Sequence, residues 1–193
     1  MLWAMAFFAL TMSLSPGPVN LISFSIATSH GLKRAFYFVS GATIGFTLLL
    51  TLIGLGATQL QSVLPITIRY MGYAGTAFII WMGFKVMTAD PDLKTNTGHT
   101  PNFLHGFLLQ WLNPKAWIAC LSGVSAFSLS SSYGRLVTFV SLYFAICYIS
   151  MFLWAWAGKQ VRHLIQDEAM ILRMNRMMGG LLIVIAAYLA LSF

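Results

Sequence analysis

Two proline-containing polar segments interrupt apolar stretches of this chain. The first is SPGPVN at residues 15–20, within the apolar run 2–28, and the second is NPK at residues 113–115, within the run 103–129. A proline removes a backbone N–H and collides with the carbonyl four residues back, so each segment predicts a broken helix. Because unpaired carbonyls are costly in contact with lipid, both breaks predict a polar cavity at membrane depth.

Lys115 is an ionisable side chain near the centre of its apolar run. Its α-carbon is expected roughly 15 Å from water on either side, which is farther than a lysine side chain of about 6 Å can reach. A charge at this depth costs at least about 3 kcal/mol. No Asp or Glu falls within an apolar run. The partner of Lys115 is therefore an anionic group on a substrate or, in a structural role, the carbonyls freed by the breaks.

The segments after the breaks predict a site for a carboxylate. They begin near Val19 and Ala116, and their helix N-termini are expected to present free N–H groups and positive dipole ends to the membrane centre. Without an intramembrane acid, a substrate ammonium is held only by carbonyl and hydroxyl dipoles, which favours a neutral zwitterion. Ser13 and Ser15 add hydroxyls before the first break. The predicted substrate-binding residues are Pro16, Gly17, Pro18, Asn20, Ser23, Gln110, Asn113, Pro114 and Lys115.

The prolines also predict which carbonyls lose their helical partners. Pro16 and Pro18 should leave the carbonyls of Met12 and Leu14 unpaired. Pro114 should do the same to the carbonyl of Gln110. The alternative is that these prolines only kink helices that pack on their neighbours.

The composition places these segments in an integral membrane protein. The 193 residues are 59% hydrophobic and 8% charged, whereas a soluble domain carries about 25% charged residues. The net charge of +7 falls mainly in loops, so it indicates anionic lipid as the partner and not nucleic acid. Six runs are long enough to span a bilayer: 2–28, 36–58, 70–87, 103–129, 136–158 and 177–193. The first lacks a basic residue before its apolar part and is too long for a signal peptide, so we expect it to be retained.

The basic residues predict the orientation in the membrane. The first, third and fifth connections hold eight of the 11 Lys and Arg residues, and the second and fourth hold one each. Because cytoplasmic loops collect positive charge, the odd-numbered connections are expected to face the cytoplasm and both termini the opposite side, the periplasm.

The matching breaks in the first and fourth spans predict an internal repeat. Repeat one covers residues 1–88, a cytoplasmic linker covers 89–102, and repeat two covers 103–193, all within one transmembrane transporter domain. Three spans per repeat is an odd number, so the two repeats are inverted. The predicted fold class is thus an all-α membrane protein with six transmembrane helices in two inverted three-helix repeats, of which helices one and four are broken. Such broken helices indicate the substrate site of a transporter.

The sequence lacks the residue groups expected of an enzyme. It has no Ser/His/Asp set, no glycine-rich phosphate loop and no metal-ligand spacing among its four histidines, so we predict no enzymatic activity, no metal and no cofactor. Two other classes stay open: a passive metabolite channel, and a transmembrane thiol–disulfide electron carrier that would use Cys120 and Cys147. The glycines at 41 and 45 predict close helix packing or a homodimer.

These motifs together resemble the LysE family of amino-acid exporters, in its threonine and homoserine (RhtB) branch. The similarity covers essentially the whole chain and includes SPGPVN, GATIG at residues 41–45 and NPK. It implies gradient-driven export of small neutral amino acids or derivatives, of the cysteine, O-acetylserine, threonine or homoserine class, across the bacterial inner membrane. The family's exporters of basic amino acids carry an acidic residue in an early span. This chain has none, which favours a neutral substrate and leaves the coupling ion open.

Overall fold

The computed structural model describes residues 1–60, 64–89, 101–165 and 167–191. These residues form helices and contain no strand, in agreement with the all-α prediction. Most of the predicted linker, residues 90–100, lies outside the described residues. In chain order the helices are α1 (Leu2–Leu14), α2 (Pro18–His30), α3 (Leu32–Leu60), α4 (Leu64–Met87), α5 (Phe103–Leu112), α6 (Pro114–Ala126), the 3₁₀ helix η1 (Leu129–Ser131), α7 (Tyr133–Leu164) and α8 (Glu168–Ala190).

Both predicted breaks are present. The helices α1 and α2 meet at an angle of 58° across the SPG segment, and Asn113 separates α5 from α6. Pro18 and Pro114 each occupy the first turn of the following helix. A proline is favoured there because its missing N–H has no helical partner and its φ angle is already suitable. The prolines therefore start two helices as well as ending two.

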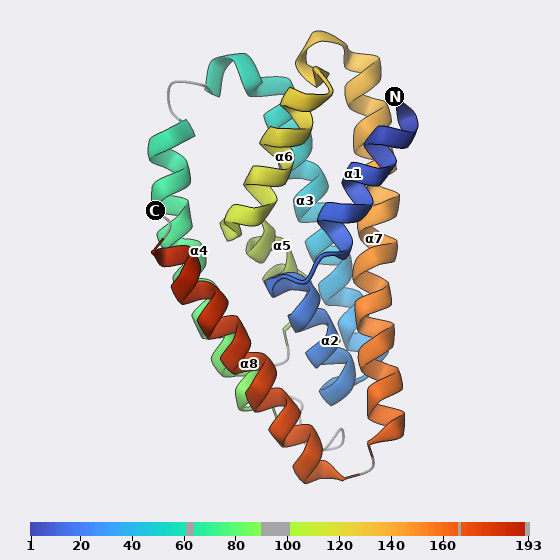
Figure 1. Cartoon of the computed structure of the whole chain (residues 1–193), viewed down its shortest axis with the longest axis vertical. Helices are drawn as coiled ribbons and strands as arrows, with labels where there is room; N and C mark the ends of the chain where they lie inside the picture. The colour runs from blue at the N-terminus through green and yellow to red at the C-terminus, as the bar shows by residue number, and fades with distance from the viewer. Residues whose placement is uncertain (61–63, 90–100, 166, 192–193) are drawn as a thin grey trace.

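The two broken helices run in opposite directions through the molecule. The pair α1–α2 descends in Figure 1, the pair α5–α6 ascends, and both breaks lie near mid-height. Around them, α3 packs against α5 and α7, α2 packs against α7, and α4 pairs with α8. The helix α2 is the most enclosed element, since all its residues from Pro18 to Ser29 except Phe24 are buried. The breaks are therefore enclosed by the other helices.

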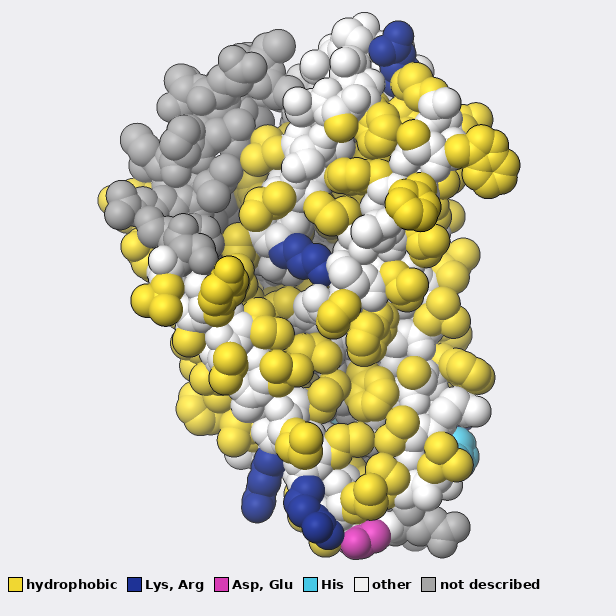
Figure 2. All heavy atoms as spheres, viewed as in Figure 1, with side chains coloured by type: hydrophobic (Ala, Val, Ile, Leu, Met, Phe, Trp, Pro, Cys, Tyr) yellow, Lys and Arg dark blue, Asp and Glu magenta, His cyan; other side chains and the backbone are white. Residues whose placement is uncertain are grey.

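The surface and the helix lengths are those of a membrane protein. Three of the described helices contain stretches long and apolar enough to span a bilayer, namely Leu32–Gly56, Tyr133–Leu164 and Glu168–Ala190, and α1 with α2 forms a fourth if the bent pair is one span. Figure 2 shows hydrophobic side chains over most of one face, with basic groups near both ends and one at mid-height. The prediction of six spans goes beyond these helices and stays a prediction.

Glycines bring the helices around α5 into close contact. A Cβ atom at Gly41 of α3 would overlap the Phe103 carbonyl, and one at Gly45 would lie 2.8 Å from the Phe107 carbonyl oxygen. Gly75 of α4 meets the Leu112 carbonyl in the same way. Of the two alternatives for residues 41 and 45, close packing is thus the one observed, within a single chain. The homodimer stays a prediction.

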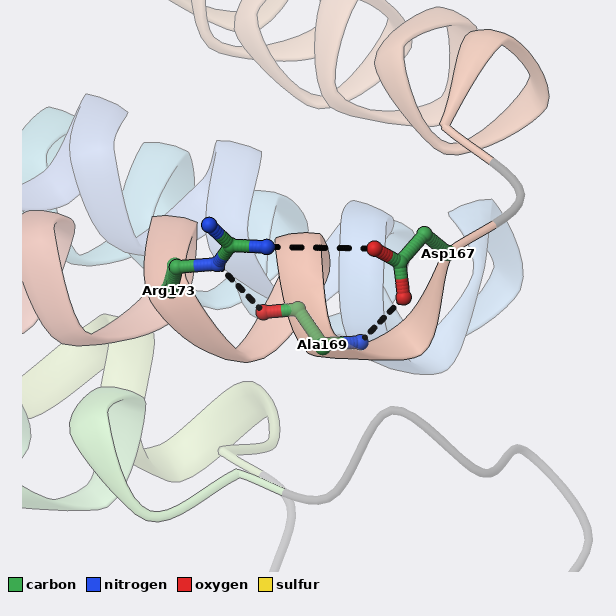
Figure 3. A network of polar contacts seen from close by, with 3 residues as sticks. All are labelled: Asp167, Ala169 and Arg173. Atoms are coloured by element: carbon green, nitrogen blue, oxygen red, sulfur yellow. Dashed lines mark hydrogen bonds and ion pairs between the residues drawn. The ribbon is translucent and has the colours of Figure 1, made fainter.

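The turn between α7 and α8 carries an exposed polar network. The carboxylate of Asp167 accepts a hydrogen bond from the Ala169 backbone N–H (2.9 Å) and lies 3.8 Å from Arg173 (Figure 3). Arg173 also donates to the Ala169 carbonyl (3.3 Å). Because both charged side chains are exposed, the ion pair contributes at most about 1 kcal/mol. The turn caps α8 and lies apart from the breaks.

Candidate functional site

Lys115 joins the two breaks. Its ammonium group donates to the Ser15 hydroxyl (2.8 Å), the Ser15 carbonyl (3.1 Å) and the Pro16 carbonyl (3.4 Å). An ammonium group has three donors, and all of these contacts lie on the first break. The cation from the second break is therefore held by the carbonyls and hydroxyl of the first.

Asn20 connects the two halves of its own broken helix. Its side-chain amide donates to the Ser13 carbonyl (2.8 Å) and the Ser15 carbonyl (3.0 Å). These bonds supply donors to two carbonyls at the end of α1, where the helical hydrogen-bond pattern stops. The other end of the amide, the Oδ1 atom, is buried and has no hydrogen-bond partner.

The prediction that three carbonyls remain unpaired is wrong. Each accepts a hydrogen bond: Met12 from the Ser15 hydroxyl (3.0 Å), Leu14 from the Trp154 indole (3.1 Å), and Gln110 from the Asn113 backbone N–H (3.4 Å). Side chains and a tight turn take over the role of the lost helical donors. The breaks are thereby stabilised before any ligand binds.

The two helix N-termini at the breaks differ. In α6, Asn113 caps the helix, because its side chain accepts from the Lys115 backbone N–H (3.1 Å) and its carbonyl accepts from Ala116 (2.9 Å). In α2, no side chain caps the helix, and no described residue accepts from the backbone N–H groups of Val19 and Asn20. The prediction of free N–H groups is thus wrong for α6 and correct for α2. The N-terminus of α2 is the one open to an anion.

A small cavity of about 40 Å³ lies between the breaks. Six predicted site residues line it: Gly17, Pro18, Asn20, Gln110, Asn113 and Lys115. Their binding of a substrate stays a prediction. The other lining residues are Met12, Ser13, Val19, Phe46, Ala116, Ala119, Tyr143, Cys147 and Met151.

Three predicted site residues do not line the cavity. Pro16 takes part through its carbonyl, which accepts from Lys115. Pro114 is buried in the first turn of α6. Ser23 is completely buried, and its hydroxyl donates to the Val19 carbonyl (2.8 Å) within α2. Ser23 therefore lies outside the cavity with its donor used inside its own helix, and its part in substrate binding stays a prediction.

Four cavity residues come from helices that carry no break. Phe46 lies on α3, and Tyr143, Cys147 and Met151 lie on α7. The three α7 residues are spaced by four, so they share one helix face. This spacing is visible in the sequence, but every face of α7 is apolar and nothing local indicates which one turns towards the breaks.

The cavity offers complementary groups to a zwitterion. The free N–H groups of α2 suit a carboxylate, and so does the positive charge of Lys115, whose donors contact Ser15 and Pro16 in the absence of a ligand. Asn20 and Ser13 line the cavity, and their buried Oδ1 and Oγ atoms make no hydrogen bond of good geometry, although Ser13 lies beside Tyr143 and Cys147. Both oxygen atoms accept hydrogen bonds and so suit an ammonium group. Since buried unpaired polar atoms cost about 1–3 kcal/mol each, a ligand that pairs with them gains affinity.

The described residues include no group of three His, Cys, Asp or Glu side chains arranged to hold a metal ion. Cys120 of α6 and Cys147 of α7 are both buried free thiols.

The helices and the cavity define a helical membrane protein with a buried polar centre between two broken helices. A family model described as "LysE type translocator" matches residues 10–192. The chain therefore belongs to the LysE family.

The chain is also similar to curated proteins named "Cysteine/O-acetylserine efflux protein". Those of Escherichia coli (strain K12) and Shigella sonnei (strain Ss046) are 27% identical over 122 residues, which cover 63% of this chain and 63% of each relative. The protein of Escherichia coli O1:K1 / APEC is 28% identical over 123 residues, again 63% of each chain. The match thus spans less than two thirds of these relatives. No solved structure gives a significant match.

Proposed function

We propose that this protein exports small neutral amino acids or their derivatives, of the cysteine, O-acetylserine, threonine or homoserine class. The observation that carries the proposal is the cavity between the breaks, which is lined by Lys115 and the α2 N-terminus, groups suited to a carboxylate, and by Asn20 and Ser13, whose oxygens suit an ammonium. The family and the names of the relatives support the same activity. The electrochemical gradient of the membrane is the proposed energy source.

The cavity favours a small substrate with a single positive charge. A water molecule needs about 10–15 Å³ of such volume, so a cavity of about 40 Å³ holds on the order of three waters. The lining residues that the structure describes include no Asp or Glu. A second ammonium group, as in lysine, would therefore enter a tight space without a counter-charge, which opposes its binding.

The proposed setting is the bacterial inner membrane, crossed six times by two inverted repeats with both termini in the periplasm. The opposite directions of the two broken helices support this arrangement (Figure 1). The packing supports it as well. The last helices of the two repeats, α4 and α8, contact each other, and the contact of α3 with α5 matches that of α7 with α1. The repeats 1–88 and 103–193 would then contribute one break each to a shared site.

Counterflow in proteoliposomes tests the proposed function. Vesicles loaded with an unlabelled amino acid should take up the same labelled compound transiently above its equilibrium level, because a carrier exchanges substrate through one site. Threonine, homoserine, O-acetylserine, cysteine and lysine form the panel, and lysine should show no overshoot. Equilibration without overshoot would identify a passive channel instead. No movement of any compound would refute the proposal.

A pair of serine variants tests the cavity. Ser13→Ala removes an unpaired hydroxyl that lines it, whereas Ser23→Ala removes an equally buried hydroxyl that bonds within α2. A neutral hydrogen bond contributes about 0.5–1.5 kcal/mol, so Ser13→Ala should raise the transport KM about 2- to 10-fold. Ser23→Ala should leave KM within twofold of the wild-type value. Equal effects of both variants would contradict this description of the cavity.

A further inference from the structure

A second, larger cavity lies along the C-terminal half of α2. It has a volume of about 220 Å³ and is lined by Ser25, Ile26, His30, Lys85, Val86, Thr88, Ala89 and Pro101. These residues come from α2, the end of α4 and the residue that precedes the α5 cap. The C-terminal end of α2 points to the lower end of the molecule in Figure 1, away from the breaks. This end carries the first and third connections, which are predicted to be cytoplasmic.

The helix α2 connects the two cavities. Asn20 lines the central cavity and Ser25 lines the second one. They are five positions apart on the helix, a rise of roughly 8 Å. The two cavities are therefore separated along α2 by about the length of a small amino acid.

Asn175 of α8 holds one wall of the second cavity. Its amide donates to the Ser29 hydroxyl (2.7 Å) and the Ala89 carbonyl (3.3 Å), and it accepts from the Ser25 hydroxyl (3.4 Å). Asn175 is completely buried. A satisfied buried network of this kind specifies one arrangement of α2, α8 and the end of α4. The cavity is thus bounded by an ordered polar wall.

Lys85 is the lining residue of the second cavity that suits a carboxylate. It makes no ion pair among the described residues. Its ammonium lies 5.8 Å from the centre of the Trp81 ring. None of the lining residues that the structure describes is acidic. A carboxylate would supply a counter-charge to Lys85 in a partly desolvated place, where such a contact is strongest.

The hydroxyl groups of the same cavity suit an ammonium. Ser25 donates its proton to Asn175 (3.4 Å) and Thr88 donates its own to the Phe84 carbonyl (2.8 Å). Both hydroxyl oxygens keep lone pairs that accept hydrogen bonds. By volume the cavity holds on the order of fifteen waters, so it accommodates an amino acid together with part of its hydration shell.

We propose that the second cavity is a loading site, which captures the α-carboxylate of an amino acid at Lys85 on the cytoplasmic side before the solute moves along α2 to the breaks. The inference rests on the proposed export of amino acids and adds a second binding site to it. The amino acid first binds in the larger second cavity with part of its hydration shell. It then loses water as it enters the smaller central cavity.

Kinetics of reconstituted protein test the loading site. Substrate is supplied on the side of the odd-numbered connections, and initial rates are measured over a range of concentrations. Lys85→Gln should raise KM about 10- to 150-fold, as expected for the loss of one charged hydrogen bond, with the maximum rate unchanged within twofold. Lys85→Arg should restore most of the affinity. Lys33→Gln, which removes an exposed lysine in the first turn of α3, controls for surface charge and should not change KM.

Labelling gives a readout that does not depend on transport. Ala89→Cys places a thiol in the wall of the second cavity, and a membrane-impermeant maleimide is located by mass spectrometry on that position. O-acetylserine and threonine, used as probes, should slow this labelling at least threefold, and adding Lys85→Gln should remove the protection. An unchanged KM together with labelling that neither probe slows would overturn the loading site. Failure of the wild-type protein to move any amino acid in counterflow would refute the proposed function. The labelling experiment tests the loading site independently of that result.

Discussion

Replacement of Lys115 by alanine is expected to reduce export at least about 100-fold while the protein still inserts into the membrane. Lys115 presents its ammonium to the cavity and to the Ser15 and Pro16 carbonyls of the opposite break. Each hydrogen bond from a charged group contributes about 1.5–3 kcal/mol, and 1.4 kcal/mol corresponds to a tenfold change. Lys115→Ala removes one bond to a substrate carboxylate and also the Lys115 hydrogen bonds that join the two breaks. The free energy lost in the two together exceeds about 3 kcal/mol.

Two quantities check this prediction. Efflux from loaded vesicles measures export, and the yield of membrane-inserted protein measures insertion. Lys115→Arg keeps the charge but enlarges the head group in a tight cavity, so we expect partial activity. Lys33→Ala is the matched control, since Lys33 is an exposed lysine far along the chain from either break, and it should export normally. Normal export by Lys115→Ala would assign Lys115 the purely structural role, as a tie to the carbonyls of the break.

Replacement of Gly75 by alanine is expected to destabilise the protein most strongly among single methyl additions near the site. The new Cβ would overlap the Leu112 carbonyl at the end of α5, immediately before the second break. A backbone carbonyl cannot rotate away as a side chain does, so α4 and α5 must separate. Overpacking costs typically about 1–3 kcal/mol or more, which corresponds to a fall of about 3–10 °C in Tm for a chain of this size.

Thermal unfolding in detergent, followed by tryptophan fluorescence, measures this effect. Gly180→Ala is the matched control, because a Cβ at Gly180 of α8 would have no atom within 4 Å. Alanine is the better helix former by about 1 kcal/mol, so this variant should melt at the wild-type temperature or slightly above. Similar Tm values for both variants would show that α4 does not contact α5 as closely as described.

The helix breaks could be predicted from sequence because their cause is local. A proline disrupts the backbone bonds within one helical turn whatever surrounds it, so SPGPVN and NPK indicated breaks and new helix starts. The observed starts at Pro18 and Pro114 lie within two residues of those predicted at Val19 and Ala116. The depth of Lys115 and the absence of acids in the apolar runs followed from composition alone.

The partners of the freed groups could not be predicted from sequence, because they depend on distant residues. The Leu14 carbonyl is paired with the Trp154 indole of α7, a contact across 140 residues that no local pattern indicates. Asn113 closes the α6 N-terminus with its own side chain, while the equivalent end of α2 stays open. These differences between the two breaks arise from tertiary packing and from the hydrogen bond that the Asn113 side chain accepts.

Hydrophobicity, charge and proline act through the bilayer and the neighbouring backbone, so the residues alone predict a helical membrane protein with two broken helices and a deep lysine. Long-range packing brings the breaks together, lets Lys115 bond to Ser15 and Pro16, and turns one face of α7 towards the cavity. The physical reason is that an apolar helix has no polar side to orient it in lipid. Its rotation is set by close packing against its neighbours, such as the contacts of Gly41 and Gly75 with α5.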